Sequence, residues 1–195
     1  VGSEMCIRDR ISTQSLHSPE HRVELADYIS KTLPKPDAIA FSCVAGEEII
    51  AQLQSLFPQW QDIEWKQLRG DSVIEGMRTL YQDSSKLGSD RWSAIIGARS
   101  LSKTNALIIN AGTATTIDLL GSNGVHYGGW ILPGLSLMHH SLESNTAQLP
   151  LAVRNSSAQG FGTSTNEAII GGCDAAQIGA IQYALDLAKQ MNLPI

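Results

Sequence analysis

The chain has 195 residues, of which 43% are hydrophobic and 17% charged, and its net charge is −5. This balance is typical of a globular protein with one large domain or two small ones, and it excludes a disordered chain. The sequence has no basic cluster and no apolar run of membrane-spanning length, so we expect neither a nucleic-acid partner nor a membrane. Three widely spaced cysteines without metal-binding spacing indicate reduced thiols in a cytoplasmic protein.

The first half of the chain predicts alternating helices and strands. Residues 1–10 have no signal-peptide pattern and do not join naturally to the adjoining segment, so we interpret them as a non-native leader. A helix is expected to begin at Ser18, with Pro19 in its first position, and to end at Thr32. The pattern of apolar residues then predicts a strand over 37–44, a helix from 46 that ends before Pro58, and a strand over 63–68. A further helix is expected from about 89 to 100, capped by Ser89 or Asp90.

Residues 106–118 read ALIINAGTATTID and predict two strands around a tight turn. Gly112 permits close backbone approach, and the turn adds N–H donors and the hydroxyls of Thr113, Thr115 and Thr116, which together suit a phosphate chain. An ordinary hairpin, with threonines chosen for strand propensity, is the simpler alternative. The elements expected after it are a turn at 121–124, a strand leading into 128–134, a helix over 135–142, an irregular segment over 150–162, and a helix over 165–190 that the glycines at 171–172 could interrupt.

The order of these elements predicts an α/β protein. Three consecutive strands followed by helices are similar to the ribonuclease H-like unit, and the first half resembles the same unit without its three-strand meander. We therefore expect two ribonuclease H-like domains, over residues 11–103 and 104–195. The first would lack its N-terminal strands and the second its C-terminal strands.

Four motifs occur in a fixed order: Leu87–Trp92, Asn110–Asp118, Gly128–Gly134 and Gly162–Ala168. Together they resemble the type III pantothenate kinases, whose relatives include the Bvg accessory factor proteins, over roughly residues 18–190. That family belongs to the actin, Hsp70 and sugar-kinase superfamily, with two ribonuclease H-like (actin-like ATPase) domains around a cleft. The resemblance implies ATP-dependent phosphorylation of pantothenate with Mg²⁺, the first step of coenzyme A biosynthesis, by a homodimer.

The resemblance also implies roles for individual residues. Asp90 would accept the proton of the substrate hydroxyl, which agrees with the need of a weak alcohol nucleophile for a carboxylate base. The substrate would be contacted by Tyr81, Gly88, Ser89, Arg91 and Thr165, and ATP by Gly112 and Thr113. Without the family, simpler interpretations stay open: a helix cap for Asp90 and Thr165, a surface ion pair for Arg91, and a loop aromatic for Tyr81.

The sequence departs from the family pattern in two places. Asn110 stands where the family often has an aspartate associated with K⁺ or NH₄⁺, and its amide oxygen lacks the charge of a carboxylate. The family's opening Asp-x-Gly-Asn-Thr motif, which binds ATP phosphates and Mg²⁺, is not found, so we expect the chain as given to be inactive or nearly so.

Two other functions stay open. One is phosphoryl transfer to a different acceptor by another member of the superfamily, and the other is a non-catalytic or regulatory nucleotide-binding protein of the same fold. A serine hydrolase is disfavoured because no Gly-x-Ser-x-Gly elbow occurs. The adjacent His139 and His140 would point to different sides of a helix and cannot act as paired ligands.

Overall fold

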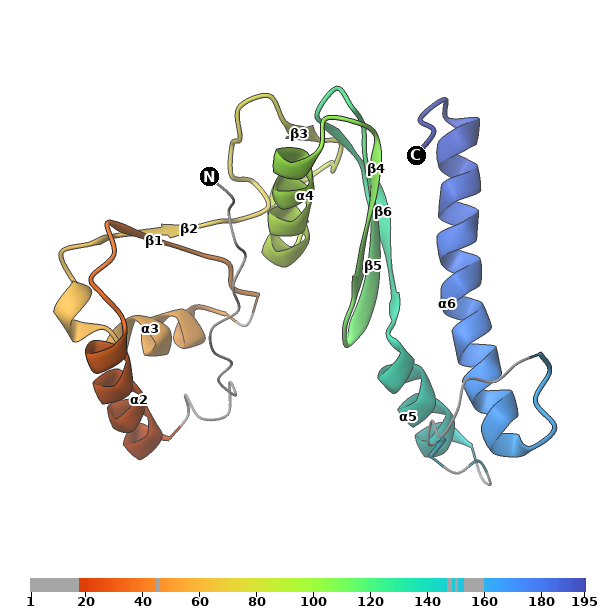
Figure 1. Ribbon diagram of the computed structural model, residues 1–195, viewed down its shortest axis with the longest axis horizontal. Coiled ribbons are helices and arrows are strands. Elements are labelled where there is room, and N and C mark those ends of the chain that lie inside the picture. The colour runs from red at the N-terminus through yellow and green to blue at the C-terminus, as the bar shows by residue number, and fades with distance from the viewer. Residues whose placement is uncertain (1–17, 45, 147–148, 150, 153–159) are drawn as a thin grey trace. The chain divides into compact units, whose positions relative to one another are not determined.

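The computed structural model describes residues 18–44, 46–146, 149, 151–152 and 160–195 (Figure 1). The secondary structure is mixed α/β, as the sequence predicts, and the chain falls into two compact units, Val1–Leu68 and Arg69–Ile195. The leader predicted at residues 1–10, and much of the irregular segment predicted over 150–162, lie outside the described residues. The domain division at residues 103 and 104 stays a prediction.

The first unit combines two helices with a small parallel sheet. Its elements are α2 (Pro19–Thr32), β1 (Ala38–Phe41), α3 (Glu47–Ser55), the 3₁₀ turn η1 (Pro58–Trp60) and β2 (Glu64–Gln67), with β1 parallel to β2. The Ser18 hydroxyl accepts the His21 N–H, which confirms the predicted start of α2. The buried core of this unit consists of Ile29, Leu56, Trp60 and Ile63.

The second unit is built on a four-stranded sheet in the order β3-β6-β5-β4. The strands are β3 (Arg78–Thr79), β4 (Ala106–Ala111), β5 (Ala114–Leu120) and β6 (Val125–Pro133). The hairpin β4–β5 and the antiparallel third strand confirm the strand predictions for this half. The short β3 pairs in parallel with β6, in a region where the sequence predicts no clear element.

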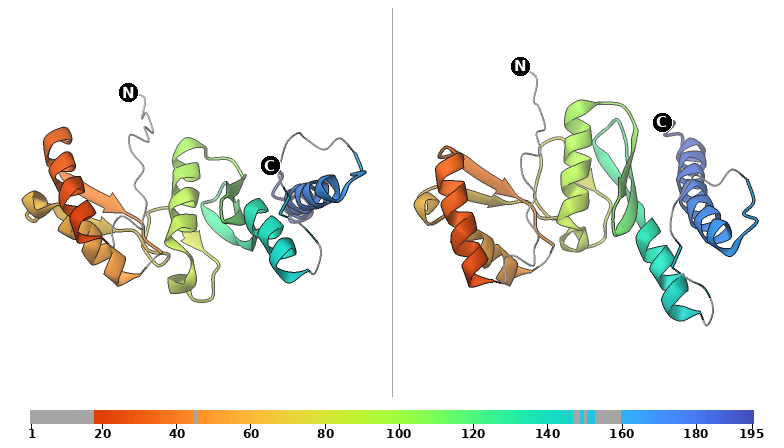
Figure 2. Two further views of the ribbon diagram at one scale, coloured as in Figure 1. Left: turned by 90° about the horizontal axis from the view of Figure 1, so that it is seen from below. Right: turned by 60° about the horizontal axis from the view of Figure 1, so that its bottom comes forward.

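Two helices cover opposite faces of this sheet, α4 (Ser89–Leu101) on one and α6 (Thr165–Gln190) on the other (Figures 1 and 2). The central strand β5 alternates between these faces, as side chains of a strand must. Ile117 and Leu119 face α6, whereas Asp118 reaches Arg91 on α4. The sheet therefore places one carboxylate beneath the first turn of α4.

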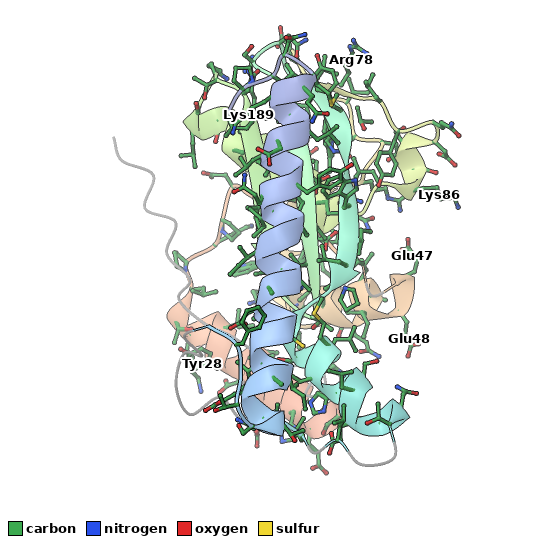
Figure 3. All side chains as sticks on the ribbon, turned by 90° about the vertical axis from the view of Figure 1, so that its right-hand side faces the viewer. Tyr28, Glu47, Glu48, Arg78, Lys86 and Lys189 are labelled. Carbon is green, nitrogen blue, oxygen red and sulfur yellow. The ribbon has the colours of Figure 1, made fainter. Side chains whose placement is uncertain are left out.

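The helix α5 (Leu135–Asn145) follows β6 and packs against α6, which runs along the length of the sheet (Figure 3). Stacking of Trp130 on Tyr183, with ring centroids 5.5 Å apart, joins β6 to α6. Although α6 has 26 residues, no helix in the described ranges combines the length and apolarity needed to cross a membrane.

Two helix caps differ from the sequence predictions, and an interruption that the sequence left open does not occur. The N-cap of α4 is Gly88, not Ser89 or Asp90. The N-cap of α6 is Ser164 rather than Thr165: its hydroxyl accepts the Glu167 N–H, so a serine one residue earlier takes the capping position. The same helix runs through the glycines at 171–172 without a break, because packing against α5 and the sheet outweighs the low helix propensity of glycine.

Candidate functional site

The first turn of α4 presents two neighbouring charged residues in opposite environments. Asp90 is exposed, whereas Arg91 is only 4% exposed. The Asp90 Oδ1 accepts the backbone N–H of Arg91 at 2.8 Å, which satisfies one of the unpaired donors at the helix start. A Cβ at position 88 would lie 2.6 Å from this oxygen, so Gly88 gives the Asp90 carboxylate the space that it occupies.

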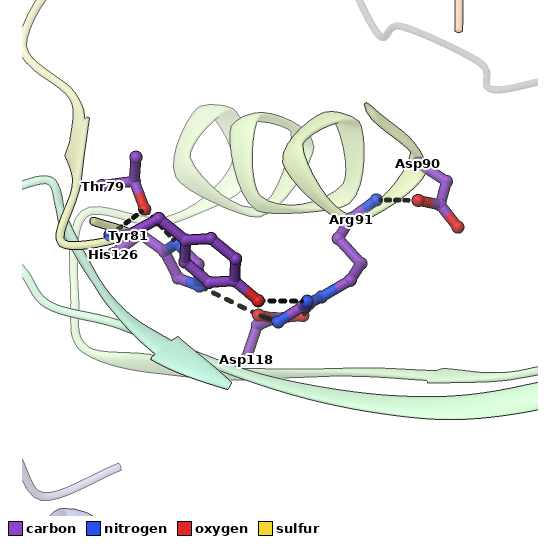
Figure 4. Close-up of polar contacts among 6 residues, drawn as sticks. All are labelled: Thr79, Tyr81, Asp90, Arg91, Asp118 and His126. Carbon is purple, nitrogen blue, oxygen red and sulfur yellow. Dashed lines mark hydrogen bonds and ion pairs between the residues drawn. The ribbon is translucent and has the colours of Figure 1, made fainter. Parts of the chain in front are cut away.

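The guanidinium of Arg91 forms a buried, bidentate ion pair with Asp118 (Figure 4). Its Nη2 donates to Oδ1 at 2.5 Å and its Nε to Oδ2 at 3.0 Å. Asp118 is 1% exposed, so the interpretation of Arg91 as part of a surface ion pair is wrong. A bidentate pair between arginine and a carboxylate is a strong hydrogen-bonded ion pair, and it fixes the relative orientation of the two groups.

Burial and pairing act in opposite directions on the pKa values of these two groups. Burial by itself would raise the pKa of Asp118, but hydrogen bonds from His126 and Arg91 and their charges hold that pKa below its ordinary value. Burial would likewise lower the pKa of Arg91, but Asp118, with a smaller contribution from Tyr81, raises that pKa above its ordinary value. Both residues are therefore charged at neutral pH.

Tyr81 joins this pair through its hydroxyl, which accepts Nη1–H of Arg91 at 2.7 Å. The guanidinium carbon lies 5.5 Å from the centroid of the Tyr81 ring, and the same ring stacks on His126 at 5.9 Å. The structure thus brings together two of the predicted substrate residues, Tyr81 and Arg91, and Asp90 precedes Arg91 in the first turn of α4.

Three further members of this group were not predicted from the sequence, namely Asp118, His126 and Thr79. The fully buried His126 contacts Asp118 Oδ1 through Nε2 and Thr79 Oγ1 through Nδ1, both at 2.9 Å. A signal was present, because Asp118 is a charged residue inside an otherwise uncharged strand, and a buried carboxylate needs partners. We refer to Thr79, Tyr81, Arg91, Asp118 and His126 as the Arg91 cluster.

The hairpin turn that was predicted to bind phosphate is closed by backbone contacts. Gly112 N–H donates to the carbonyl of Ala114, and the Thr113 carbonyl accepts Gly134 N–H at 2.9 Å. A Cβ at position 134 would lie 2.0 Å from the Gly112 carbonyl oxygen, so the turn and the end of β6 need this close approach.

The side chains around this turn differ in exposure. Thr113 and Asn110 are exposed, whereas Thr115 and Thr116 are only 3% and 8% exposed. Of the three threonine hydroxyls that were expected to suit a phosphate chain, that of Thr113 belongs to an exposed side chain, and those of Thr115 and Thr116 belong to buried ones. The N–H of Gly112 is also committed to the turn, whereas the polar side chains of Thr113 and Asn110 are presented at its surface.

Thr165 lies in a third place, as the exposed first residue of α6. It lines an apolar groove between α5 and α6 together with Met138 and Leu142. The predicted site residues therefore divide into the start of α4 with the Arg91 cluster, the turn at 112–113, and this end of α6.

Comparison with known proteins gives matches along most of the chain. A family model for type III pantothenate kinase matches residues 1–186. A type III pantothenate kinase of Herminiimonas arsenicoxydans is 43% identical over 150 residues, 75% of this chain and 58% of that relative. One from Janthinobacterium sp. (strain Marseille) is 41% identical over 168 residues, 80% of this chain and 63% of that relative.

A solved structure has a similar fold. The crystal structure of a Baf family protein from Campylobacter jejuni has a TM-score of 0.56 and 23% sequence identity, covering 81% of this chain and 67% of the other. The present chain spans 58% and 63% of the length of the two curated relatives above. From the family model and these identities, the chain belongs to the type III pantothenate kinase family.

Proposed function

We propose that the whole protein uses ATP to phosphorylate pantothenate to 4′-phosphopantothenate, the first step of coenzyme A biosynthesis. The observation that carries this proposal is the exposed carboxylate of Asp90 at the start of α4, directly beside the buried Arg91 cluster. Family membership supplies the substrate, and this geometry supplies a base next to groups suited to an acidic ligand.

Asp90 would act as the general base. The primary hydroxyl of pantothenate loses its proton to the Asp90 carboxylate as its oxygen forms a bond to the γ-phosphorus, and the bond from that phosphorus to ADP breaks. One carboxylate oxygen of Asp90 is held by the Arg91 backbone N–H, which fixes the orientation of the carboxylate. The exposure of Asp90 leaves room for a substrate hydroxyl.

The substrate's polar groups would be held at the start of α4. The guanidinium of Arg91 has five N–H donors, of which three serve the Arg91 cluster. The helix N-terminus adds partial positive charge, which favours an anion such as the pantothenate carboxylate. Tyr81 would contribute its hydroxyl, Gly88 and Ser89 backbone groups, and Thr165 a further hydroxyl.

The turn at 112–113 would contact the phosphates of ATP. Thr113 fits this role because its side chain is exposed at a turn whose backbone is fixed from within. Mg²⁺ would arrive bound to the nucleotide phosphates, as it does in kinases generally. Asn110 offers K⁺ or NH₄⁺ one neutral oxygen, which fits a cation less well than a carboxylate would, so no step of the reaction is assigned to a monovalent cation.

The overall organisation follows from the family. We propose two ribonuclease H-like domains, over residues 11–103 and 104–195, in a cytoplasmic homodimer. The second half supports a dimer surface on α6, where large apolar side chains such as Ile178 and Tyr183 are more than 60% exposed.

The proposal is tested by incubating the whole protein with ATP, Mg²⁺ and either pantothenate, a sugar or acetate, with product detected by mass spectrometry. Phosphopantothenate from the pantothenate reaction alone is the expected result. Turnover of another acceptor would assign a different kinase activity, and nucleotide binding without any turnover would assign a regulatory protein. The chain as given, assayed beside the whole protein, tests the expectation that it is inactive by itself.

A further inference from the structure

The contacts of the Arg91 cluster form a closed ring of hydrogen bonds. Arg91 binds Asp118 and Tyr81, Asp118 binds His126, and His126 binds Thr79. The ring closes because the backbone N–H of Tyr81 donates to Thr79 Oγ1 at 3.1 Å. Figure 4 shows these side chains, contributed by β3 and the segment after it, α4, β5 and β6, linked to one another by hydrogen bonds.

The direction of the hydrogen bonds is fixed at Arg91 and Asp118. Arg91 can only donate, and the ionised Asp118 can only accept. Nε2 of His126 hydrogen-bonds Asp118, and Nδ1 of His126 shares a hydrogen bond with Thr79 Oγ1, which also accepts from Tyr81 N–H. Each member of the ring thus has at least one hydrogen-bond partner within it.

The direction of the ring has a consequence for Tyr81. Its hydroxyl oxygen accepts from Arg91 Nη1 at 2.7 Å, so its own proton is directed away from the guanidinium. Tyr81 is half-buried, whereas Arg91, Asp118 and His126 are at most 4% exposed. Because the Tyr81 hydroxyl oxygen is occupied as an acceptor by Arg91, its proton is free to serve as a hydrogen-bond donor to a ligand.

The space around the ring is closely fitted. A Cβ on Gly129 would lie 2.3 Å from Asp118 Oδ1 and 2.8 Å from Arg91 Nη2. The neighbouring Trp92 donates its indole N–H to the Ser72 carbonyl and packs near His126, with ring centroids 6.2 Å apart. These contacts hold the ring in one arrangement before any ligand arrives, and such preorganisation strengthens binding.

We propose that Asp118, His126 and Thr79 are positioning residues, which hold the Arg91 guanidinium in place and orient the Tyr81 hydroxyl as a donor to an acceptor oxygen of the substrate. This inference rests on the proposed function, because it takes pantothenate as the ligand. Asp118, His126 and Thr79 would make no direct contact with the substrate and would act on it through Arg91 and Tyr81.

The sharpest test compares two substitutions of Thr79 in the whole protein. Thr79→Val keeps the β-branched shape but removes the hydroxyl, whereas Thr79→Ser keeps the hydroxyl. Loss of this link is expected to raise the Kd and KM for pantothenate by about fivefold in Thr79→Val. The KM for ATP and kcat should stay within about twofold of wild type, and Thr79→Ser should bind pantothenate nearly as wild type does.

A second pair probes the buried half of the ring. His126→Gln can present an amide N–H near the position of Nε2, whereas His126→Leu cannot. We therefore expect His126→Leu to weaken pantothenate binding about tenfold or more, and His126→Gln to retain most of the wild-type affinity. Ile95→Val, at a fully buried position of α4 outside the ring, is the control for general destabilisation and should leave pantothenate binding unchanged.

The outcomes separate this inference from the proposed function. Wild-type protein that binds no pantothenate would overturn the proposed function. Wild-type protein that binds pantothenate, together with a folded Thr79→Val variant of equal affinity, would overturn the positioning role alone. A parallel loss of ATP and pantothenate affinity in Thr79→Val and His126→Leu would also overturn it, because a purely structural defect affects both ligands.

Discussion

The Arg91 cluster and the turn at Asn110–Thr113 lie in the same unit and differ in what fixes their geometry. In the cluster, side chains fix one another, with Arg91 and Asp118 almost fully buried. In the turn, the backbone is fixed by the contacts of Gly112 and Gly134, while the side chains of Thr113 and Asn110 are exposed.

This difference separates two ways of preparing a site. The cluster is complete without a ligand and is coupled to the stability of the fold, so its substitutions should act on folding and on substrate affinity together. The exposed side chains of the turn make no comparable contribution to folding, so their substitutions should act on ligand binding alone. Asp90 combines features of both, since its backbone is part of α4 and its carboxylate is exposed.

The largest expected effect is on stability. Asp118→Ala would leave the Arg91 charge buried without its partner, which costs about 3–5 kcal/mol of unfolding free energy. Chemical denaturation of wild type and variant measures this difference. The exposed pair Lys35–Asp62 has a comparable 2.6 Å separation and is the matched control, since Asp62→Ala should cause only a small loss.

A double variant refines this prediction. Arg91→Met with Asp118→Leu removes both charges and should recover part of the lost stability, because an apolar pair can replace a buried ion pair. Recovery should be incomplete, since His126 Nε2 loses its acceptor. A double variant as unstable as Asp118→Ala would show that shape, not charge pairing, dominates at this position.

The next effect concerns catalysis at Asp90. In the whole protein, Asp90→Asn keeps the size of the side chain but removes the base, and kcat should fall by about 100-fold or more. Because Asp90 is exposed, the melting temperature of the variant should differ little from that of wild type. Turnover near the wild-type rate would show that Asp90 is not the base, and a large loss of stability would place Asp90 with the cluster instead.

The sequence predicts part of this contrast and misses the rest for a physical reason. Local patterns suffice for the hairpin of residues 106–120, the start of α2 at Ser18 and the placement of Asp90 in a helix start. The Arg91–Asp118 pair joins residues 27 positions apart, and it depends on which face of β5 meets α4. Periodicity alone does not contain that information. The two-residue β3, which carries Thr79, is too short to give any pattern.

A smaller effect, on the unfolding free energy, is expected at acidic pH. Because the pKa of Asp118 is lowered in the folded state, its ionisation stabilises the fold above its unfolded pKa of about 3.9, and this contribution is lost as the pH falls through the lower folded value. The pKa of Arg91 is raised in the folded state, so its contribution to stability would be lost as the pH rises, and only at strongly alkaline pH.

Unfolding free energy measured between pH 6 and the acid limit, roughly pH 2, tests this contribution. Wild type should lose stability more steeply below pH 4 than Asp118→Asn, by at most about 1.4 kcal/mol per pH unit. Asp83 is an exposed carboxyl whose pKa is also lowered, by hydrogen bonds from Ser85, and it supplies the comparison Asp83→Asn, which should reduce the slope less than Asp118→Asn does because solvent screens an exposed group. Equal slopes in wild type and Asp118→Asn would show that the pKa of Asp118 does not differ between the folded and unfolded states.

The smallest effect should come from the turn. Thr113→Val removes an exposed hydroxyl, so the unfolding free energy should stay within about 0.5 kcal/mol of wild type, while the KM for ATP should rise about fivefold in the whole protein. Thr113→Ser keeps the hydroxyl and should retain the wild-type KM for ATP. A loss of ATP affinity in both variants would mean that the hydroxyl and the methyl group of Thr113 both contribute to binding. An unchanged affinity in both would remove Thr113 from the nucleotide site, and the contrast with the Arg91 cluster would then hold for substrate binding alone.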